Sequence, residues 1–144
     1  MLYIAYGSNM VRHQMDYRCP DAVLLGIGDL PGYTLEFYSH ATIEPDHSGG
    51  SSVPVVVWNI SDHDESRLDS YEGYPFYYGK ELRTVNMRDG SQIEGMVYFM
   101  RAKYKHGQPD SYYCEDIKQA YIDLGLSSEI DTVLNPALKR CYDR

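Results

Sequence analysis

Short apolar segments alternate with turn residues through most of the chain, a pattern typical of β-strands. Residues 53–60 are β-branched and almost continuously apolar, which predicts a strand buried on both faces, with Pro54 at its start or on an edge. The Asp89-Gly90 pair between two strand-like runs favours a hairpin. The predicted strands are residues 2–5, 22–27, 33–38, 41–43, 53–60, 77–86 and 93–100.

Helical spacing of apolar residues is confined to fewer segments. It is clearest in residues 110–124, where apolar side chains recur at i, i+3, i+4 and i+7. A second helix is predicted to begin at an Asp62 cap, with Glu65 at the capping-box position, and to end before Gly73. The predicted helices are residues 10–17, 61–71, 110–124 and a last piece that begins near 128 and stops before Pro136.

The order of these elements predicts an α+β fold rather than a doubly wound one. Short strands with tight turns and few crossover helices favour a mostly antiparallel curved sheet or small barrel with helices packed on it. Residues 44–52 are rich in turn formers and are interpreted as a surface loop between two strands. Since no linker or repeat divides the chain, residues 1–144 are expected to form one domain.

Composition narrows the class of protein further. The net charge of −8 disfavours nucleic-acid binding, because an acidic surface repels the phosphate backbone. No signal peptide or membrane-spanning segment is evident. The 3 widely spaced cysteines predict neither a disulfide framework nor a zinc site, so a cytoplasmic location is expected. The 15 tyrosines are suited to walls that are both apolar and polar.

The segment Tyr6-Gly7-Ser8-Asn9-Met10 directly follows the first predicted strand. A glycine-containing turn that leads into a helix exposes backbone N–H groups, which bind carboxylates and oxyanions. The alternative is a simple strand-to-helix turn capped by Ser8 or Asn9, and such turns are common. On the residues alone, both interpretations stay open.

Glu72 is a candidate proton carrier because it stands where a helix is predicted to end. Partial negative charge at a helix C-terminus disfavours a carboxylate there, and the tyrosines around it would add desolvation. Both effects raise the pKa of a glutamate toward the range in which it transfers protons near neutral pH. The alternative is an exposed glutamate at a helix end.

Histidines and nucleophiles give weaker signals. The five histidines have no metal-binding spacing, and His63 within Asp62-His63-Asp64-Glu65 fits a solvated first helical turn, so no metal is assigned. No nucleophile elbow, Walker motif or Rossmann fingerprint is present, and Ser8 has no base nearby in sequence. The histidines are His13, His40, His47, His63 and His106.

Two motifs together resemble the γ-glutamylcyclotransferase superfamily in its AIG2-like branch. The first is Tyr6-Gly7-Ser8-Asn9-Met10, similar to Y-G-S-N-L, and the second is residues 68–73, similar to L-D-x-x-E-G. Further stretches agree in the same order along nearly the whole chain: residues 30–37, 41–43, 56–58, 93–98 and 109–113.

The resemblance implies a fold and a reaction. The fold would be a compact, mixed but mostly antiparallel β-barrel flanked by helices. The reaction would be attack of the α-amine of a γ-glutamyl group on its own γ-amide carbonyl, giving 5-oxoproline and a free amine or amino acid without a cofactor. Glu72 would be the general acid/base. Tyr6, the Gly7-Ser8-Asn9-Met10 backbone and Tyr113 would bind the substrate.

Some positions depart from the family pattern. Met10 replaces the usual leucine, and Val55 stands where a glycine is common, so the barrel and the substrate are expected to differ nearby. The implied partner is a small γ-glutamyl compound, with neither nucleic acid nor membrane, and the protein would be a monomer or homodimer. A different class of function stays open, in which the pocket binds an acidic metabolite or a protein partner without catalysis.

Overall fold

A closed β-barrel forms the centre of the protein. The computed structural model describes residues 1–101 and 107–144. In the order β1-β5-β2-β6-β7 every neighbouring pair is antiparallel, and β1 closes the barrel against β7 in parallel. The barrel confirms the expected α+β class. Its strands are β1 (Leu2–Ala5), β2 (Val23–Pro31), β5 (Ser52–Asn59), β6 (Tyr78–Met87) and β7 (Gln92–Met100).

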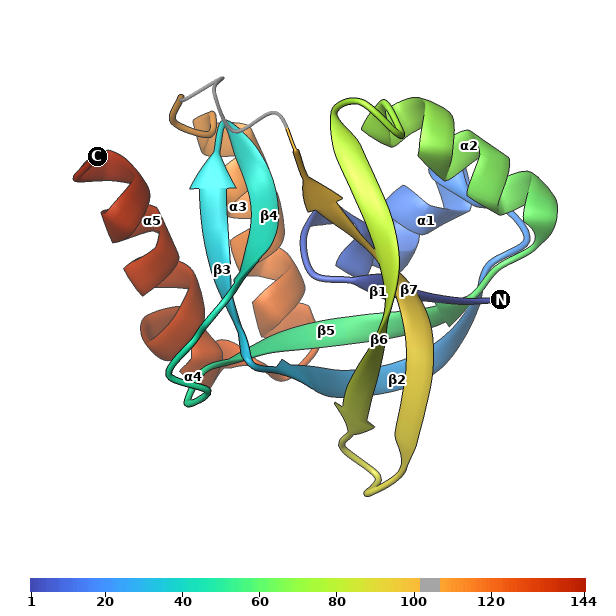
Figure 1. The fold of residues 1–144 in the computed structure, drawn as a ribbon, viewed down its shortest axis with the longest axis horizontal. Coiled ribbons are helices and arrows are strands. Elements are labelled where there is room, and N and C mark those ends of the chain that lie inside the picture. Colours follow the sequence, from blue (N-terminus) through green and yellow to red (C-terminus); the bar gives the residue numbers. More distant parts are fainter. Residues whose placement is uncertain (102–106) are drawn as a thin grey trace.

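A separate two-stranded sheet stands beside the barrel. It consists of β3 (Tyr33–Tyr38) and β4 (His40–Pro45), which pair antiparallel from Tyr33↔Pro45 to Tyr38↔His40. Figure 1 shows this hairpin rising between the barrel and the C-terminal helices. Its turn, at Ser39, takes a positive φ of 65° although the residue is not glycine. The hairpin packs on the barrel through β4 against β7 and β3 against β5.

The strand predicted to be buried on both faces is β5. Every residue from Val53 to Trp58 is buried. Pro54 pairs with Asp29 on β2, whereas β1 reaches only as far as Val56, so the missing N–H of Pro54 faces no β1 partner. Val55 is fully buried opposite Gly28, inside the core. Because Val55 is fully buried, its departure from the family pattern bears on the packing of the barrel core.

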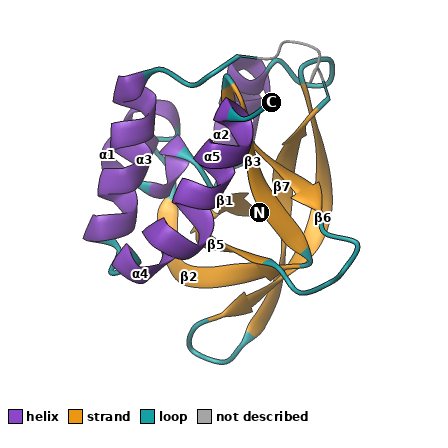
Figure 2. Cartoon of the chain, turned by 90° about the vertical axis from the view of Figure 1, so that its left-hand side faces the viewer, coloured by secondary structure: helices purple, strands orange, loops and turns teal. Residues whose placement is uncertain are grey.

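The helices gather on one side of the barrel (Figure 2). Helix α1 follows a short 3₁₀ turn, η1, directly after β1, and α2 connects β5 to β6. Among the C-terminal elements, α5 and η2 pack on β3 of the hairpin, and α3 packs on η1. Their bounds are η1 (Ser8–Met10), α1 (Arg12–Arg18), α2 (Asp62–Glu72), α3 (Ser111–Asp123), α4 (Ser127–Glu129), the π-helical η2 (Ile130–Leu134) and α5 (Asn135–Tyr142).

Two local predictions about helix ends are wrong. Ser61, not Asp62, caps α2: its hydroxyl accepts the Asp64 N–H and the Asp64 carboxylate accepts the Ser61 N–H, a capping box one residue earlier. The last helical stretch also continues through Pro136 to Tyr142. Pro136 lies in the first turn of α5, directly after the π-helical segment, where a missing N–H is tolerated.

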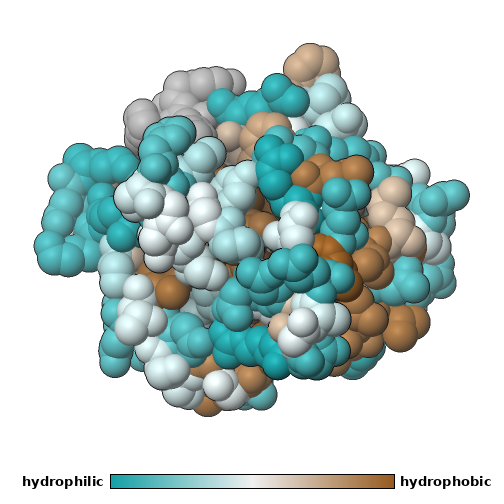
Figure 3. Space-filling model, turned by 60° about the horizontal axis from the view of Figure 1, so that its bottom comes forward, coloured by the Kyte–Doolittle hydropathy of each residue, from teal (hydrophilic) through white to brown (hydrophobic). Residues whose placement is uncertain are grey.

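The outer surface is mostly polar, with apolar side chains collected on part of the face shown in Figure 3. Exposed apolar residues include Val23, Leu24 and Leu25 at the start of β2 and Leu82 on β6. None of the helices in the described part of the chain has the length and apolar character needed to cross a bilayer. Whether the protein is a monomer or a homodimer stays a prediction.

The cap of α2 provides a stability test. Asp64 is fully buried and its carboxylate also accepts the Asp21 N–H, so Asp64→Ala removes the capping box and leaves two partly buried N–H donors, of Ser61 and Asp21, unpaired. We expect a loss of about 1–2 kcal/mol in the free energy of unfolding, measured by urea denaturation. Asp62→Ala, at the exposed residue that the sequence predicted as the cap, is the control and should cost roughly 0.5 kcal/mol or less. Equal losses would contradict the assignment of the cap.

Candidate functional site

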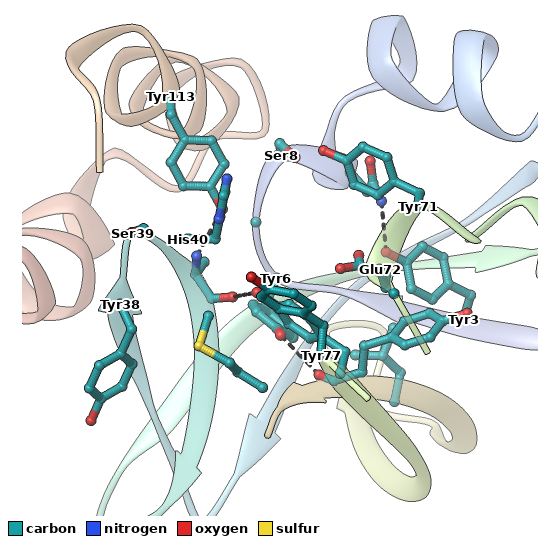
Figure 4. Close-up of a pocket in the computed structure, with 18 of the residues that line it drawn as sticks. Tyr3, Tyr6, Ser8, Tyr38, Ser39, His40, Tyr71, Glu72, Tyr77 and Tyr113 are labelled. Atoms are coloured by element: carbon teal, nitrogen blue, oxygen red, sulfur yellow. Dashed lines mark hydrogen bonds between the residues drawn. The ribbon is translucent and has the colours of Figure 1, made fainter. Parts of the chain in front are cut away.

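A cleft of about 520 Å³ lies where the end of the barrel, the hairpin β3–β4, the end of α2 and the first turn of α3 meet. Figure 4 shows Glu72, Tyr71 and Tyr3 on one side of this cleft, and Tyr38, Ser39 and His40 on the opposite side. Tyr113 and Ser8 lie between the two sides. The N-terminal loop and Glu72, which are more than sixty positions apart in sequence, therefore face one cavity.

Glu72 is the last residue of α2. Gly73 ends the helix in the left-handed conformation, with φ of 64°, and its N–H donates to backbone carbonyls of the preceding turn. The Glu72 side chain points into the cleft (Figure 4) and is partly buried. Burial raises its pKa from 4.5 to about 7, while the nearby charge of Arg18 lowers it. The expected desolvated carboxylate is present.

The charge of Glu72 acts on side chains from several elements. It raises the pKa of Tyr3 and Tyr6 on and after β1, of Tyr78 on β6 and of Tyr113 on α3, and burial raises the pKa of each of them more strongly. An ionised Glu72 is therefore surrounded by neutral rings. The cleft is a place of low polarity in which a single charge has a large effect.

The N-terminal loop contributes backbone rather than free side chains. Gly7 is the N-cap of η1, and no side chain caps this turn. The N–H groups of Ser8 and Asn9 lie at the start of η1, where no preceding turn of helix provides carbonyl acceptors for them. Asn9 is buried and fixed: its Nδ2 donates to the Tyr3 hydroxyl over 3.0 Å, and its carbonyl accepts the Trp58 indole N–H over 3.0 Å. The Asn9 side chain thus holds the loop.

Met10 does not join the cleft. Its side chain is buried in the core with 1% exposure, and its N–H donates to the Gly7 carbonyl over 3.1 Å. The backbone donor that the sequence assigned to Met10 is therefore already used inside the loop. Tyr6, Gly7, Ser8, Asn9 and Tyr113 do line the cleft, as predicted.

Tyr113 stands at the N-terminal turn of α3, where Asp110 accepts its N–H over 2.8 Å. Its hydroxyl accepts the Ala41 N–H over 2.9 Å, which joins α3 to β4. The hydroxyl also lies close to Gly7, since a Cβ at that glycine would be 3.6 Å away. Tyr113 therefore connects the N-terminal loop to the hairpin wall.

The tyrosine hydroxyls in this cleft are largely used within the protein. Tyr6 donates to the Tyr98 carbonyl over 2.9 Å, and Tyr78 donates to the Ala41 carbonyl over 2.8 Å. Tyr98 donates to the Asp69 carboxylate over 2.6 Å. These three side chains present ring surface to the cavity, while Glu72, the loop backbone and other lining residues such as Ser39 and His40 offer polar groups to a ligand.

Sequence analysis missed Arg18, the last residue of α1. Its Nη1 lies 2.6 Å from Asn9 Oδ1 and 3.2 Å from Ser8 Oγ, and its guanidinium stacks 3.7 Å from the centre of the Tyr71 ring. Arg18 thus ties the loop to the residue before Glu72 and brings a positive charge near the carboxylate. Only its place at the end of a short helix, which favours a cation, gave any signal.

A second missed feature supports α2 from behind. Lys80 on β6 lies 2.8 Å from Asp69 and 2.9 Å from Glu65, both on α2, and the three side chains are partly buried. The Asp69 carbonyl accepts the Tyr74 N–H just beyond the helix. Lys80 therefore neutralises two carboxylates and holds against the barrel the turn that carries Glu72.

Metal-binding chemistry has no support in the described residues, which contain no group of three or more histidine, cysteine or acidic side chains suited to a metal ion. His40 lines the cleft, and His63 lies in the exposed first turn of α2. His106 lies outside the described residues.

Comparison with known proteins gives a consistent result. Residues 3–119 match the family model described as gamma-glutamyl cyclotransferase, AIG2-like. The chain is 31% identical to a gamma-glutamylcyclotransferase of Bos taurus over 93% of this chain and 77% of that protein. It is 30% identical to one of Mus musculus, over 89% and 73%. A solved gamma-glutamyl cyclotransferase structure superposes with a TM-score of 0.79 at 24% identity, covering 92% of this chain and 86% of that one. The chain belongs to the γ-glutamyl cyclotransferase family, in its AIG2-like branch.

Proposed function

We propose that the protein cyclises a γ-glutamyl amide to 5-oxoproline and releases an amine or amino acid. The family and the named relatives support this class of reaction. The observation that carries the proposal is a desolvated carboxylate, Glu72, in the same cleft as the open backbone of the Ser8 turn. A proton carrier and an anion-binding backbone are what an intramolecular aminolysis requires.

The proton route needs only Glu72. Ionised Glu72 takes a proton from the substrate α-ammonium, and the free amine attacks the γ-carbonyl carbon. A new C–N bond closes the five-membered ring as the old amide C–N bond breaks. Glu72 returns its proton to the leaving nitrogen, which also receives the second proton lost by the attacking amine. No net proton is gained or lost, so one carboxyl group is sufficient.

The substrate itself helps to set the charge of Glu72. In the free protein the pKa of Glu72 is about 7, so only part of it is ionised at neutral pH. A substrate ammonium in the cleft favours the carboxylate and lowers that pKa. Binding therefore prepares the base, while the neutral tyrosine rings keep the pair poorly solvated and strengthen their interaction.

The loop backbone is assigned to bind the negatively charged groups of the substrate and of the reaction. The N–H groups of Ser8 and Asn9 would receive the substrate α-carboxylate or the oxyanion formed on the γ-carbonyl. Tyr6 and Tyr113 would limit how the glutamyl chain folds, which favours the conformer that closes the ring. A non-catalytic pocket for an acidic metabolite is less consistent with this site, because the carboxylate of Glu72 would oppose an acidic ligand.

Glu72→Gln tests the assigned base. The amide keeps the shape of the side chain but cannot accept the ammonium proton, so we expect 5-oxoproline release to fall by a factor of roughly 100 or more. The measurement is mass spectrometry of a panel of γ-glutamyl compounds after incubation with each variant. Asp62→Asn, on the same helix but exposed and absent from the lining of the cleft, is the matched control and should keep most of the activity. Unchanged turnover in Glu72→Gln would rule out the proposed role.

The raised pKa of Glu72 also predicts that Glu72→Gln, which should lose activity, gains stability at high pH. Because the unfolded chain ionises near 4.5 and the folded protein near 7, wild-type stability falls as pH rises through that interval. Glu72→Gln should therefore be more stable than wild type at pH 8, by about 1–3 kcal/mol, and should lose this advantage below pH 4.5. Thermal melts at both pH values measure it. An advantage that does not depend on pH would contradict the desolvated carboxylate.

Arg18 should shift the pH dependence of catalysis. The proposed base must be ionised, so kcat/KM of the wild type should rise with pH through about 7. Arg18→Met removes the charge that lowers the pKa of Glu72, so the midpoint should move to higher pH. Arg12→Met, on the same helix and exposed, is the control and should leave the midpoint unchanged. A midpoint that stays at the wild-type value in Arg18→Met would contradict the electrostatic role of Arg18.

A further inference from the structure

The cleft is larger than the group that cyclises. Of the catalytic elements assigned above, Glu72 lies on one side and Ser8 between the two sides, whereas the cavity of about 520 Å³ continues to the hairpin β3–β4 (Figure 4). The product ring has only five members, so a bound γ-glutamyl amide directs its leaving group into the remaining space. The hairpin contributes Tyr38, Ser39, His40 and Ala41 to the lining, and Tyr113 packs against His40. Tyr77 and Met100 also line the cavity.

Four of these residues, Tyr38, His40, Tyr77 and Tyr113, are aromatic, and Met100 carries a thioether, whereas Ser39 and Ala41 have small side chains. Among the described lining residues Glu72 is the only acidic one and none is lysine or arginine, so the hairpin side offers a leaving group no fixed charge. The Tyr113 hydroxyl is held by the Ala41 N–H. Met100 contributes a polarisable sulfur, which makes favourable contacts with aromatic rings. The surface facing the leaving group is therefore aromatic in character.

The hairpin side is also fixed in place. The Tyr38 hydroxyl donates to Glu44 over 2.6 Å, and the Arg144 guanidinium stacks 4.0 Å from the centre of the Tyr38 ring. His40 packs edge-on against Tyr113, with ring centres 5.4 Å apart and planes at 83°. Such edge-to-face geometry is the arrangement that aromatic pairs prefer. A rigid wall loses little freedom on binding, and part of it is open, since Tyr77 and His40 are exposed.

From these contacts we infer that the hairpin side of the cleft is the leaving-group subsite and that it selects γ-glutamyl conjugates of aromatic amines. The inference rests on the proposed function, because it concerns the group that the cyclisation releases. An aromatic ring placed between His40 and Tyr77 would cover exposed ring surface and add edge-to-face contacts. An aliphatic leaving group of the same size would give only the burial of apolar area.

The test compares two neutral conjugates of nearly the same shape on the full-length protein. One is γ-glutamyl-phenethylamide and the other is γ-glutamyl-(2-cyclohexylethyl)amide, so that the leaving groups differ in aromaticity rather than in bulk. We expect kcat/KM, followed by 5-oxoproline release, to favour the phenyl compound by roughly three- to ten-fold. Wild type and Glu72→Gln are assayed together, so that release by the proposed chemistry is distinguished from background.

Variants of one residue identify the source of the preference. His40→Ala should reduce the phenyl-to-cyclohexyl ratio toward one, whereas His40→Phe, which keeps a ring but no titratable nitrogen, should retain the ratio. His47→Ala is the matched control, because His47 lies in the exposed loop between β4 and β5 and does not line the cleft. Thermal melts of each variant show whether the fold is kept.

The outcomes separate the two proposals. Release that depends on Glu72 but proceeds equally well with both conjugates would overturn the aromatic subsite and leave the proposed function standing. Release from neither conjugate, nor from simpler γ-glutamyl compounds, would overturn the proposed function and the subsite with it. A phenyl preference that is undiminished in His40→Ala would also contradict a subsite at the hairpin turn.

Discussion

The burial of one carboxylate, Glu72, is the constraint on which the site depends. Two effects destabilise the ionised form of Glu72: the partial negative charge at the C-terminus of α2, and the loss of hydration on burial. The surrounding structure has to hold it there. Lys80 neutralises Asp69 and Glu65 on the same helix, and Gly73 turns the chain away directly after Glu72. The resulting pKa of about 7 is a consequence of the fold.

The tyrosines give the cleft its low polarity without leaving hydroxyls unpaired. Tyr6, Tyr78 and Tyr98 each donate to an acceptor supplied by another strand or helix. Each bond therefore ties together elements of the wall while the ring faces inward. Phenylalanine would give the same apolar surface but not these connections. The high tyrosine content, which sequence analysis related to walls of mixed character, has this structural role.

Sequence patterns predicted those parts of the site that depend on local chemistry. The C-terminal place of Glu72 followed from Gly73, and the turn after β1 followed from Tyr6-Gly7-Ser8-Asn9. Arg18 could not be predicted, because its contacts with Ser8 and Asn9 depend on how α1 folds back over the loop. The role predicted for Met10 was wrong for a similar reason. Its N–H donates to the Gly7 carbonyl within η1, and its side chain is buried in the core. The barrel was predicted, but the exclusion of the β3–β4 hairpin from it depends on the long-range pairing of β2 with β5.

The two sides of the cleft belong to different parts of the fold, and this division has a chemical consequence. The proposed base, Glu72, and the loop backbone are held by the closed barrel and by α2, where a change would disturb packed strands and the Lys80 contacts. The opposite wall belongs to the hairpin β3–β4, which is a separate sheet with an exposed His40 at its turn. If the proposed function and subsite hold, substitution at the hairpin turn would alter which leaving group fits while the proposed base and loop stay the same. A fold arranged in this way can keep one reaction and change its substrates.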